Sequence, residues 1–274
     1  MLVAALLAAT MQAPITFMSF NVRYATASDG ANTWPLRQGL VYDAIVRRSP
    51  DVLGVQEALA SQVDDLLVHL PGYAYVGVGR DDGKRAGEFA AVFYKRDKFQ
   101  VVESETFWLS DTPEVPGSKS WGNTVVRVCT RARLRTSDGQ VFDAFNAHYD
   151  HESQPSRERS SALVLSRVLA AGVPSVLMGD LNAGETNTAV ASLKEGGLVD
   201  TLRALKPDEK DVGTFNGFDP KGTKGEKIDY VFTTPGWKVL DAGIDRSTFD
   251  ARCPSDHWPV WAVVETVRSS PVKF

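Results

Sequence analysis

Short apolar segments alternate with polar stretches along nearly the whole chain, and their spacing differs between two kinds of element. Segments of six to eleven apolar or alternating residues predict strands, bounded by residues typical of turns. They are residues 15–20, 51–56, 73–78, 89–95, 99–108, 125–135, 141–148, 173–178, 227–232 and 258–264. Apolar residues at helical spacing predict helices over residues 34–48, 59–70 and 154–171.

The order of these elements repeats. A strand-helix-strand-helix segment is followed by a run of strands and then by strand-helix-strand again, so one half of the chain echoes the other. With 274 residues and 43% hydrophobic content, a single large α/β domain is the natural interpretation. No internal repeat or low-complexity segment interrupts the sequence.

Polar residues stand at the ends of six of the apolar segments. They are Asn21, Glu57, His148, the pair Asp180 and Asn182, Asp229, and the pair Asp256 and His257. Ends of neighbouring strands meet at the rim of a sheet, so these side chains are expected to lie together. Hydrolysis of a phosphate ester needs oxygen ligands for a hard cation, a group that positions water and a histidine active near neutral pH. The set contains all three.

In these motifs and their order, the chain resembles the endonuclease/exonuclease/phosphatase superfamily, which includes DNase I-like nucleases, sphingomyelinases, inositol-phosphate phosphatases and deadenylases. The resemblance extends over residues 15–265 and is nearest to compact bacterial members. It implies a four-layered αββα sandwich of two mixed sheets, an enzymatic domain over residues 14–268, and dependence on Mg²⁺ or Mn²⁺.

The resemblance also implies roles for the individual residues. Metal binding falls to Asn21, Glu57, Asp256, Asp180 and Asn182, and the last two would also orient the attacking water. His257 would act on the phosphate as acid or base, with Asp229 orienting its ring. His148 would be catalytic and would pair with Glu88.

Several of these residues have simpler explanations. Glu57 suits the N-terminus of the following helix, Asp180 and Asn182 suit a turn, and Glu88 suits an exposed strand edge. Substrate contacts are predicted for Arg127, Phe215 and Trp258. The alternatives are a solvated charged face on the alternating strand that contains Arg127, and ordinary packing for the two aromatic residues.

Charge restricts the substrate. A net charge of -4 and a pI near 5.6 argue against a strongly basic nucleic-acid surface. The first hypothesis is therefore hydrolysis of a small or surface-attached phosphodiester or phosphomonoester, such as a sugar phosphate, a lipid head group or a nucleotide. A metal-dependent endo- or exonuclease is the second hypothesis and a catalytically silent binding module is the third. Strong binding of duplex DNA is not expected.

The remaining features concern localisation and the thiols. Residues 1–13 are apolar with small residues at their end, which favours a signal peptide and a periplasmic or secreted enzyme. A helix or an extra strand is the alternative, with a cytoplasmic location, and the segment is too short to span a bilayer as a helix, so stable membrane insertion is not expected. Cys129 and Cys253 are interpreted as ordinary thiols, although a disulfide between them and the oligomeric state stay open.

Overall fold

A computed structural model describes residues 13–267 of the chain. The predicted signal peptide therefore lies almost entirely outside the described residues. The elements are β1 (Ile15–Asn21), a 3₁₀ turn (Gly30–Asn32), α1 (Trp34–Arg48), β2 (Val52–Ala58), α2 (Ala60–His69), β3 (Tyr73–Val76), β4 (Phe89–Lys95), β5 (Phe99–Trp108), β6 (Val128–Thr136), β7 (Val141–His148), α3 (Gln154–Ala170), β8 (Ser175–Asp180), α4 (Thr188–Glu195), β9 (Val199–Asp200), α5 (Thr201–Leu205), β10 (Asp229–Thr233), β11 (Trp237–Ile244) and β12 (Val260–Thr266).

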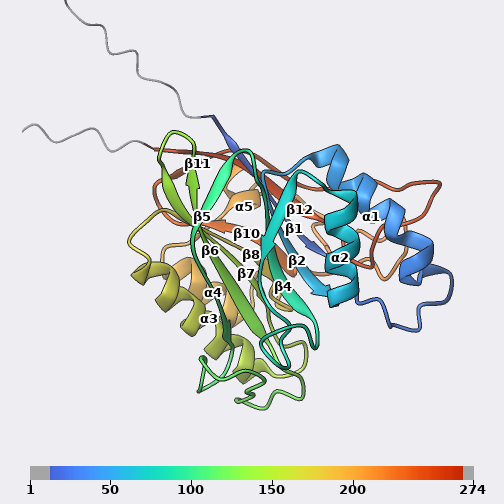
Figure 1. Cartoon of the computed structure of the whole chain (residues 1–274), viewed down its shortest axis with the longest axis horizontal. Coiled ribbons are helices and arrows are strands. Elements are labelled where there is room, and N and C mark those ends of the chain that lie inside the picture. The colour runs from blue at the N-terminus through green and yellow to red at the C-terminus, as the bar shows by residue number, and fades with distance from the viewer. Residues whose placement is uncertain (1–12, 268–274) are drawn as a thin grey trace, which may run out of the picture.

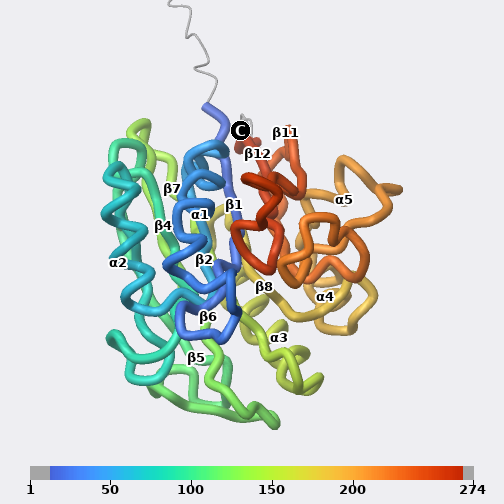
Figure 2. Tube along the Cα trace, turned by 90° about the vertical axis from the view of Figure 1, so that its right-hand side faces the viewer, coloured from blue at the N-terminus to red at the C-terminus, as the bar shows by residue number. Residues whose placement is uncertain are grey.

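Two six-stranded sheets form the centre of the molecule. Their strand orders are β11-β12-β1-β2-β4-β3 and β5-β6-β7-β8-β10-β9. In each sheet one parallel pair, β1 with β2 or β7 with β8, is flanked by antiparallel neighbours. Both sheets are therefore mixed. The first combines the strands of residues 15–95 with the two C-terminal strands β11 and β12, and the second is built from strands of residues 99–233. Figure 2 shows the described chain beginning and ending at the same end of the molecule, where Ile15 of β1 pairs with Val264 of β12.

The sheets pack face to face through alternating residues of their strands. Phe17 on β1, Phe142 and Ala144 on β7, and Met178 on β8 all belong to the apolar layer between the sheets. The intervening residues face outward, as the two-residue period of a strand requires.

Helices cover the two outer faces. α1 and α2 bury Val41, Ile45, Val63 and Leu66 against the first sheet, and α3 and α4 bury apolar residues including Val164 and Leu193 against the second. Figure 1 shows α1 and α2 on one side of the strands and α3 and α4 on the other. The predicted four-layered αββα sandwich is confirmed.

The three predicted helices are all observed. α1 has the predicted bounds, with Pro35 in its first turn; α2 is one residue shorter at each end and α3 is one residue shorter at its C-terminal end. The short helices α4 and α5 were not predicted. His69, in the last turn of α2, stacks on Tyr42 with ring centroids 4.0 Å apart. Among the described residues no helix is long and apolar enough to cross a membrane.

The charged face of β6 is a correction to the sequence analysis. Arg131 and Arg133 are only partly exposed: both donate to the carboxylate of Asp143, which is fully buried on β7, at 2.7 Å. Arg133 also donates to the carbonyl of Ala171, just past α3. The alternation was recognised correctly, but the helical layer covers part of this face, so the arginines form partly buried ion pairs with Asp143.

Both cysteines are free thiols and both are buried. Cys129 contributes to the core under α3 and α4. Cys253 is 1% exposed and does not line the cleft described below.

Truncating Phe142 should test the layer between the sheets. Its ring makes edge-to-face contacts with Phe17, Phe99 and Trp237, with centroids 5.6 to 5.8 Å apart. Phe142→Ala is expected to lower the free energy of unfolding by about 3–5 kcal/mol, because a large fully buried ring is replaced by a cavity. Chemical denaturation followed by tryptophan fluorescence measures this change, and a loss below about 1 kcal/mol would contradict the assigned packing.

Candidate active site

Four strands bring polar side chains to one end of the layer between the sheets. Asn21, His148, Asp180 and Asp229 continue the inward-facing positions of β1, β7, β8 and β10, respectively, at the strand ends where the apolar core stops. Two of them, His148 and Asp180, line a cleft of about 850 Å³ together with His257. Asn21 and Asp229 do not line it but are hydrogen-bonded to Asp180 and His257, respectively. The sheet architecture therefore brings together residues that are up to 236 positions apart.

His257 and Asp229 form a buried pair. The Nδ1 atom of His257 lies 2.9 Å from Oδ2 of Asp229, and its Nε2 atom lies 3.8 Å from Oδ2 of Asp180. Burial alone would lower the pKa of His257, but the carboxylates of Asp229 and Asp180 outweigh it and hold the pKa well above its usual value. The ring is therefore an imidazolium at neutral pH, held with one N–H toward Asp229.

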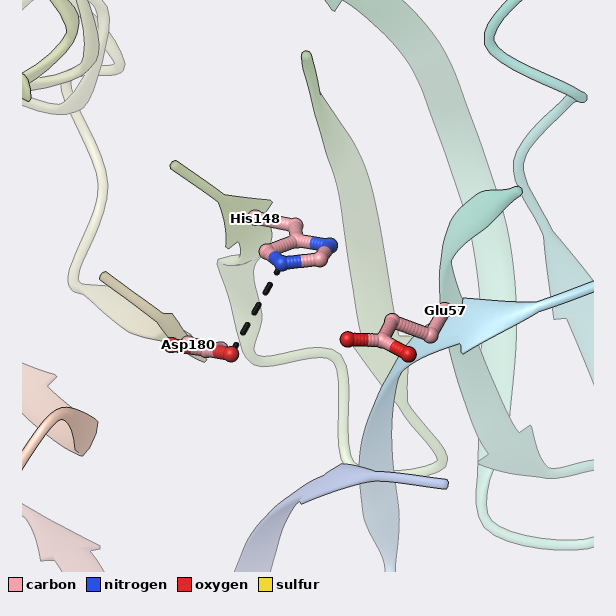
Figure 3. A group of neighbouring side chains, drawn as sticks. All are labelled: Glu57, His148 and Asp180. Atoms are coloured by element: carbon pink, nitrogen blue, oxygen red, sulfur yellow. Dashed lines mark ion pairs between the residues drawn. The ribbon is translucent and has the colours of Figure 1, made fainter. Parts of the chain in front are cut away.

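Asp180 lies at the centre of the polar cluster. It accepts a hydrogen bond from Nδ2 of Asn21 at 3.0 Å and lies 3.7 Å from Nε2 of His148. Burial and the neighbouring Asp229 raise the pKa of Asp180 to about 7. In Figure 3, Asp180, His148 and Glu57 approach a common point from separate strands, β8, β7 and β2.

Glu57 reaches the cleft through an unusual backbone conformation. Its φ angle is +65°, in the left-handed region. The carboxylate accepts hydrogen bonds from Nδ2 of Asn21 at 3.0 Å and from the backbone N–H of Tyr24 at 3.2 Å. Glu57 therefore does more than begin a helix, the simpler explanation considered from sequence.

The two asparagines are held by hydrogen bonds. Asn21 donates from its amide nitrogen to Glu57 and Asp180, while its oxygen accepts from the N–H of Arg23. In this arrangement Asn21 orients two carboxylates, and its metal-binding role stays a prediction. Asn182 lines the cleft, and its side chain donates to the carbonyl of Tyr149.

Glu88 has a closer partner than the predicted His148. Its carboxylate receives a 2.6 Å hydrogen bond from Arg80, whereas Nδ1 of His148 lies 3.8 Å away. Burial raises the pKa of Glu88 to about 7. The predicted proximity to His148 is present, but Arg80 makes the direct bond, so Glu88 is not an exposed strand-edge acid.

Arg127 enters the cleft beside His148. Its Nη1 atom is 3.0 and 2.8 Å from the two ring nitrogens of His148, and its Nη2 atom is 2.8 Å from Nδ1 of His151. One N–H cannot bond in the ring plane to two nitrogens that point apart, so the guanidinium lies over the ring. Burial and this guanidinium hold the pKa of His148 well below its usual value, and the ring is neutral.

The two predicted aromatic contacts have different outcomes. Phe215 forms an isolated antiparallel bridge with His257, packs edge-on against its ring at 5.2 Å, and is 52% exposed in the cleft. Trp258 is 1% exposed and donates from its indole nitrogen to the carbonyl of Gly222. The prediction that Trp258 contacts substrate is therefore wrong. Neighbouring residues of an extended segment point in opposite directions, so His257 faces the cleft and Trp258 faces the core.

Loops add charged residues to the cleft that the sequence analysis did not select. They are Arg23, Arg80, Lys224 and Glu226. Arg23 lies 3.0 Å from Asp29 and 3.6 Å from Asp256. The loop over residues 208–225 contributes Phe215, Lys224 and Gly225 to the lining of the cleft.

The donor set fits a hard divalent cation. Ligand atoms of Glu57, His148 and Asp180 lie within 4.8 Å of one another. Asp256 lines the same cleft. Burial raises the pKa values of Asp180 and Asp256, so crowded carboxylates would be stabilised by added positive charge. Carboxylate oxygens around an accessible cleft are ligands that Mg²⁺ and Mn²⁺ prefer.

An αββα sandwich with carboxylates and a His–Asp pair at its strand ends is the architecture of a phosphoesterase fold, and comparison with known families identifies the family. Residues 18–257 match the model of the endonuclease/exonuclease/phosphatase family. The chain belongs to this family, whose members are phosphoesterases and nucleases.

Solved structures of the family resemble the chain over most of its length. A family protein from Bacteroides thetaiotaomicron is 36% identical with a TM-score of 0.86, and covers 93% of this chain and 96% of its own. A mannosyl-6-phosphatase from the same organism is also 36% identical, with a TM-score of 0.85 and coverage of 91% and 99%. Nocturnin of Drosophila melanogaster is 24% identical over 86% of this chain and 38% of its own length.

Proposed function

We propose that this protein is a divalent-metal-dependent phosphoesterase that hydrolyses a small phosphate ester, with sugar phosphates as the first substrate class. The observation that carries the proposal is the His257–Asp229 pair, 2.9 Å apart, which faces Asp180 in a cleft lined with carboxylates and arginines.

The charge states of the residues suit in-line attack by water. Asp180, with a pKa near 7, can accept a proton from water, since a base works best when its pKa is near the working pH. His257, held as an imidazolium by Asp229 and Asp180, stabilises negative charge on the phosphate oxygens. Asn182 orients the water beside Asp180. Arg127, over the neutral ring of His148, supplies a fixed positive charge.

A cation would be held by Glu57 and Asp256, beside Asp180 and Asn182, which line the same cleft. When bound, Mg²⁺ or Mn²⁺ supplies charge neutralisation at the phosphate oxygens. This proposal assigns Glu57 and Asp256 mainly to metal binding, which leaves Asp180 and His257 for proton transfer and charge stabilisation.

The side chains described so far act on the phosphate group, and fewer observations bear on the leaving group of the substrate. Phe215 presents half of its surface at the cleft, and an exposed ring suits packing against the face of a sugar. The extensive similarity to a mannosyl-6-phosphatase supports the same class. The presence of every catalytic side chain expected from the family motifs argues against a silent binding module.

A substrate panel tests the proposal. We expect the highest kcat/KM on mannose 6-phosphate or a related hexose phosphate, compared with p-nitrophenyl phosphate, bis-p-nitrophenyl phosphate, a single-stranded oligonucleotide and a phospholipid. Phosphate release and product chromatography measure the rates. Preference for the oligonucleotide would replace this proposal with the nuclease hypothesis.

Duplex DNA should bind weakly. With a net charge of -4, we expect a dissociation constant no tighter than the roughly 10⁻⁴–10⁻⁶ M of non-specific binders. Fluorescence anisotropy with a labelled duplex at about 0.15 M salt measures it. Tighter binding with a steep salt dependence would indicate many phosphate contacts and would contradict this prediction.

A further inference from the structure

Strand alternation places Glu57 on the wrong face of its sheet for a metal site. On β2, Val52 packs in the layer between the sheets, while Leu53 and Val55 pack under α1 and α2. Continued alternation would direct Gln56 inward and Glu57 outward, toward the helices. The carboxylate of Glu57 nevertheless lines the cleft.

A β-bulge accounts for the difference. Val55 pairs with Ala91 and Ala58 pairs with Phe89, so β2 has one more residue than β4 between the two pairs. Ala58 again faces the helices. Gln56 and Glu57 are therefore both available to the inner face, and the left-handed conformation of Glu57 makes the turn. Bulges of this kind redirect side chains next to active sites.

The side chain of Asn146, from the opposite sheet, bridges β2 and β4 at the bulge. Nδ2 of Asn146, on β7, donates to the carbonyl of Val55 on β2 at 2.9 Å and to that of Ala91 on β4 at 2.8 Å. Its Oδ1 atom accepts from Nε2 of Gln56 at 2.6 Å. Asn146 and Gln56 are both fully buried, so every one of these bonds is made away from water.

The residue facing Asn146 makes room for it. A Cβ atom on Gly54 would lie 2.7 Å from Oδ1 and 2.9 Å from Cγ of Asn146. The φ angle of Gly54 is not in the left-handed region, so the absence of a side chain serves close approach and not backbone conformation. Gly54 and Asn146 therefore fit together across the two sheets.

We propose that Asn146 is a positioning residue that holds the β2 bulge and thereby directs Glu57 into the metal site. The inference rests on the proposed function, in which Glu57 binds the cation. Asn146 touches neither the cleft nor Glu57, and it acts through the carbonyls of Val55 and Ala91 and through Gln56.

Direct Mn²⁺ binding tests this role without relying on turnover. Wild type, Asn146→Ala, Gly54→Ala and Thr234→Val are titrated with Mn²⁺ and free ion is measured by electron paramagnetic resonance. Thr234→Val is the matched control. Like Asn146, Thr234 is buried and its side chain hydrogen-bonds to backbone, here to the N–H and carbonyl of Ser175. Thr234 follows the end of β10 that is opposite to Asp229, and so lies away from the cleft. Melting temperature and kcat are measured on the same preparations.

We expect Asn146→Ala to weaken Mn²⁺ binding by about 10-fold or more, as loss of a group that orients a ligand does, and to lower kcat. Gly54→Ala should reproduce the effect with Asn146 still present, because its new methyl group displaces the amide; it carries the test alone if Asn146→Ala does not fold. Thr234→Val should lower the melting temperature and leave Mn²⁺ affinity unchanged.

Wild-type Mn²⁺ affinity in a folded Asn146→Ala or Gly54→Ala protein would overturn the positioning role while leaving the metal site intact. Failure of the wild-type protein itself to bind Mn²⁺ would instead overturn the proposed metal site, and the inference with it. The two failures are therefore distinguishable in one experiment.

Discussion

His257→Ala is expected to reduce turnover on the best substrate by on the order of 10²-fold or more, with the fold retained. The imidazolium contacts Asp229 at 2.9 Å and faces Asp180 at 3.8 Å, so its removal takes away the positive charge nearest the two carboxylates. The space left by the ring opens Asp229 toward the cleft, where water can solvate it. Circular dichroism, melting temperature and kcat on the same preparation separate catalysis from folding.

Two further variants sharpen this prediction. Asp229→Asn should cause part of the same loss, because the ring remains but loses its charged partner and its orientation. Lowering the pH should not restore Asp229→Asn fully, since protonation alone does not restore orientation. His69→Ala is the matched control. His69, in α2, stacks on Tyr42 of α1, and removing the His69 ring should leave turnover unchanged. A stable His257→Ala enzyme with wild-type turnover would remove His257 from the mechanism.

Strand-end residues could be predicted from sequence because the physics of a sheet is local and regular. Asn21, His148, Asp180 and Asp229 each end or begin a recognisable apolar segment, and the two-residue period gives all four the same face as the core beneath them. Once those segments pack as two sheets, their ends must meet. Helical spacing of apolar residues likewise gave the bounds of α1, α2 and α3 to within one residue at each end, whereas the short helices α4 and α5 were not predicted.

The residues that could not be predicted depend on irregular backbone or on contacts between distant segments. Arg80 and Lys224 reach the cleft from loops that carry no periodic signal. Trp258 was predicted to contact substrate as an aromatic residue that could line the pocket, but it directly follows His257, and neighbouring residues of an extended segment face opposite sides. Phe215 shares the face of His257 because the two pair across an isolated bridge 42 positions apart in sequence.

Glu57 departs from the regular alternation of β2, and it still lies in the cleft where it was predicted to lie. Its assignment came from the motif, whereas simple alternation along β2 would have directed it to the helices. The bulge that corrects its direction depends on Asn146, a residue 89 positions later on the other sheet. No local pattern in residues 52–58 encodes that partner, apart from Gly54, whose missing side chain becomes meaningful only when β7 is packed against it.

Removing divalent cations is expected to abolish turnover, and adding Mg²⁺ or Mn²⁺ is expected to restore it. Glu57, Asp180 and Asp256 share one cleft, so their ionised carboxylates repel a phosphate unless a cation is present. Burial raises the pKa values of Asp180 and Asp256, and a bound cation would favour their charged forms. The measurement is the rate after treatment with EDTA and gel filtration, before and after addition of each metal. EDTA already saturated with Mg²⁺ is the control for effects of the chelator itself.

Stability gives a second measurement of the same site that does not require the substrate. A cation that binds only the folded state at 100 times its dissociation constant stabilises it by about 2.7 kcal/mol, which for a chain of this size raises the melting temperature by roughly 5–10 °C. Glu57→Gln should remove most of this increase, because it replaces a charged ligand by a neutral one. Full activity in a preparation shown by elemental analysis to be metal-free, together with a melting temperature that Mg²⁺ does not change, would mean that the clustered carboxylates act without a metal, leaving His257, Arg127 and Arg80 as the groups that offset the charge of the phosphate.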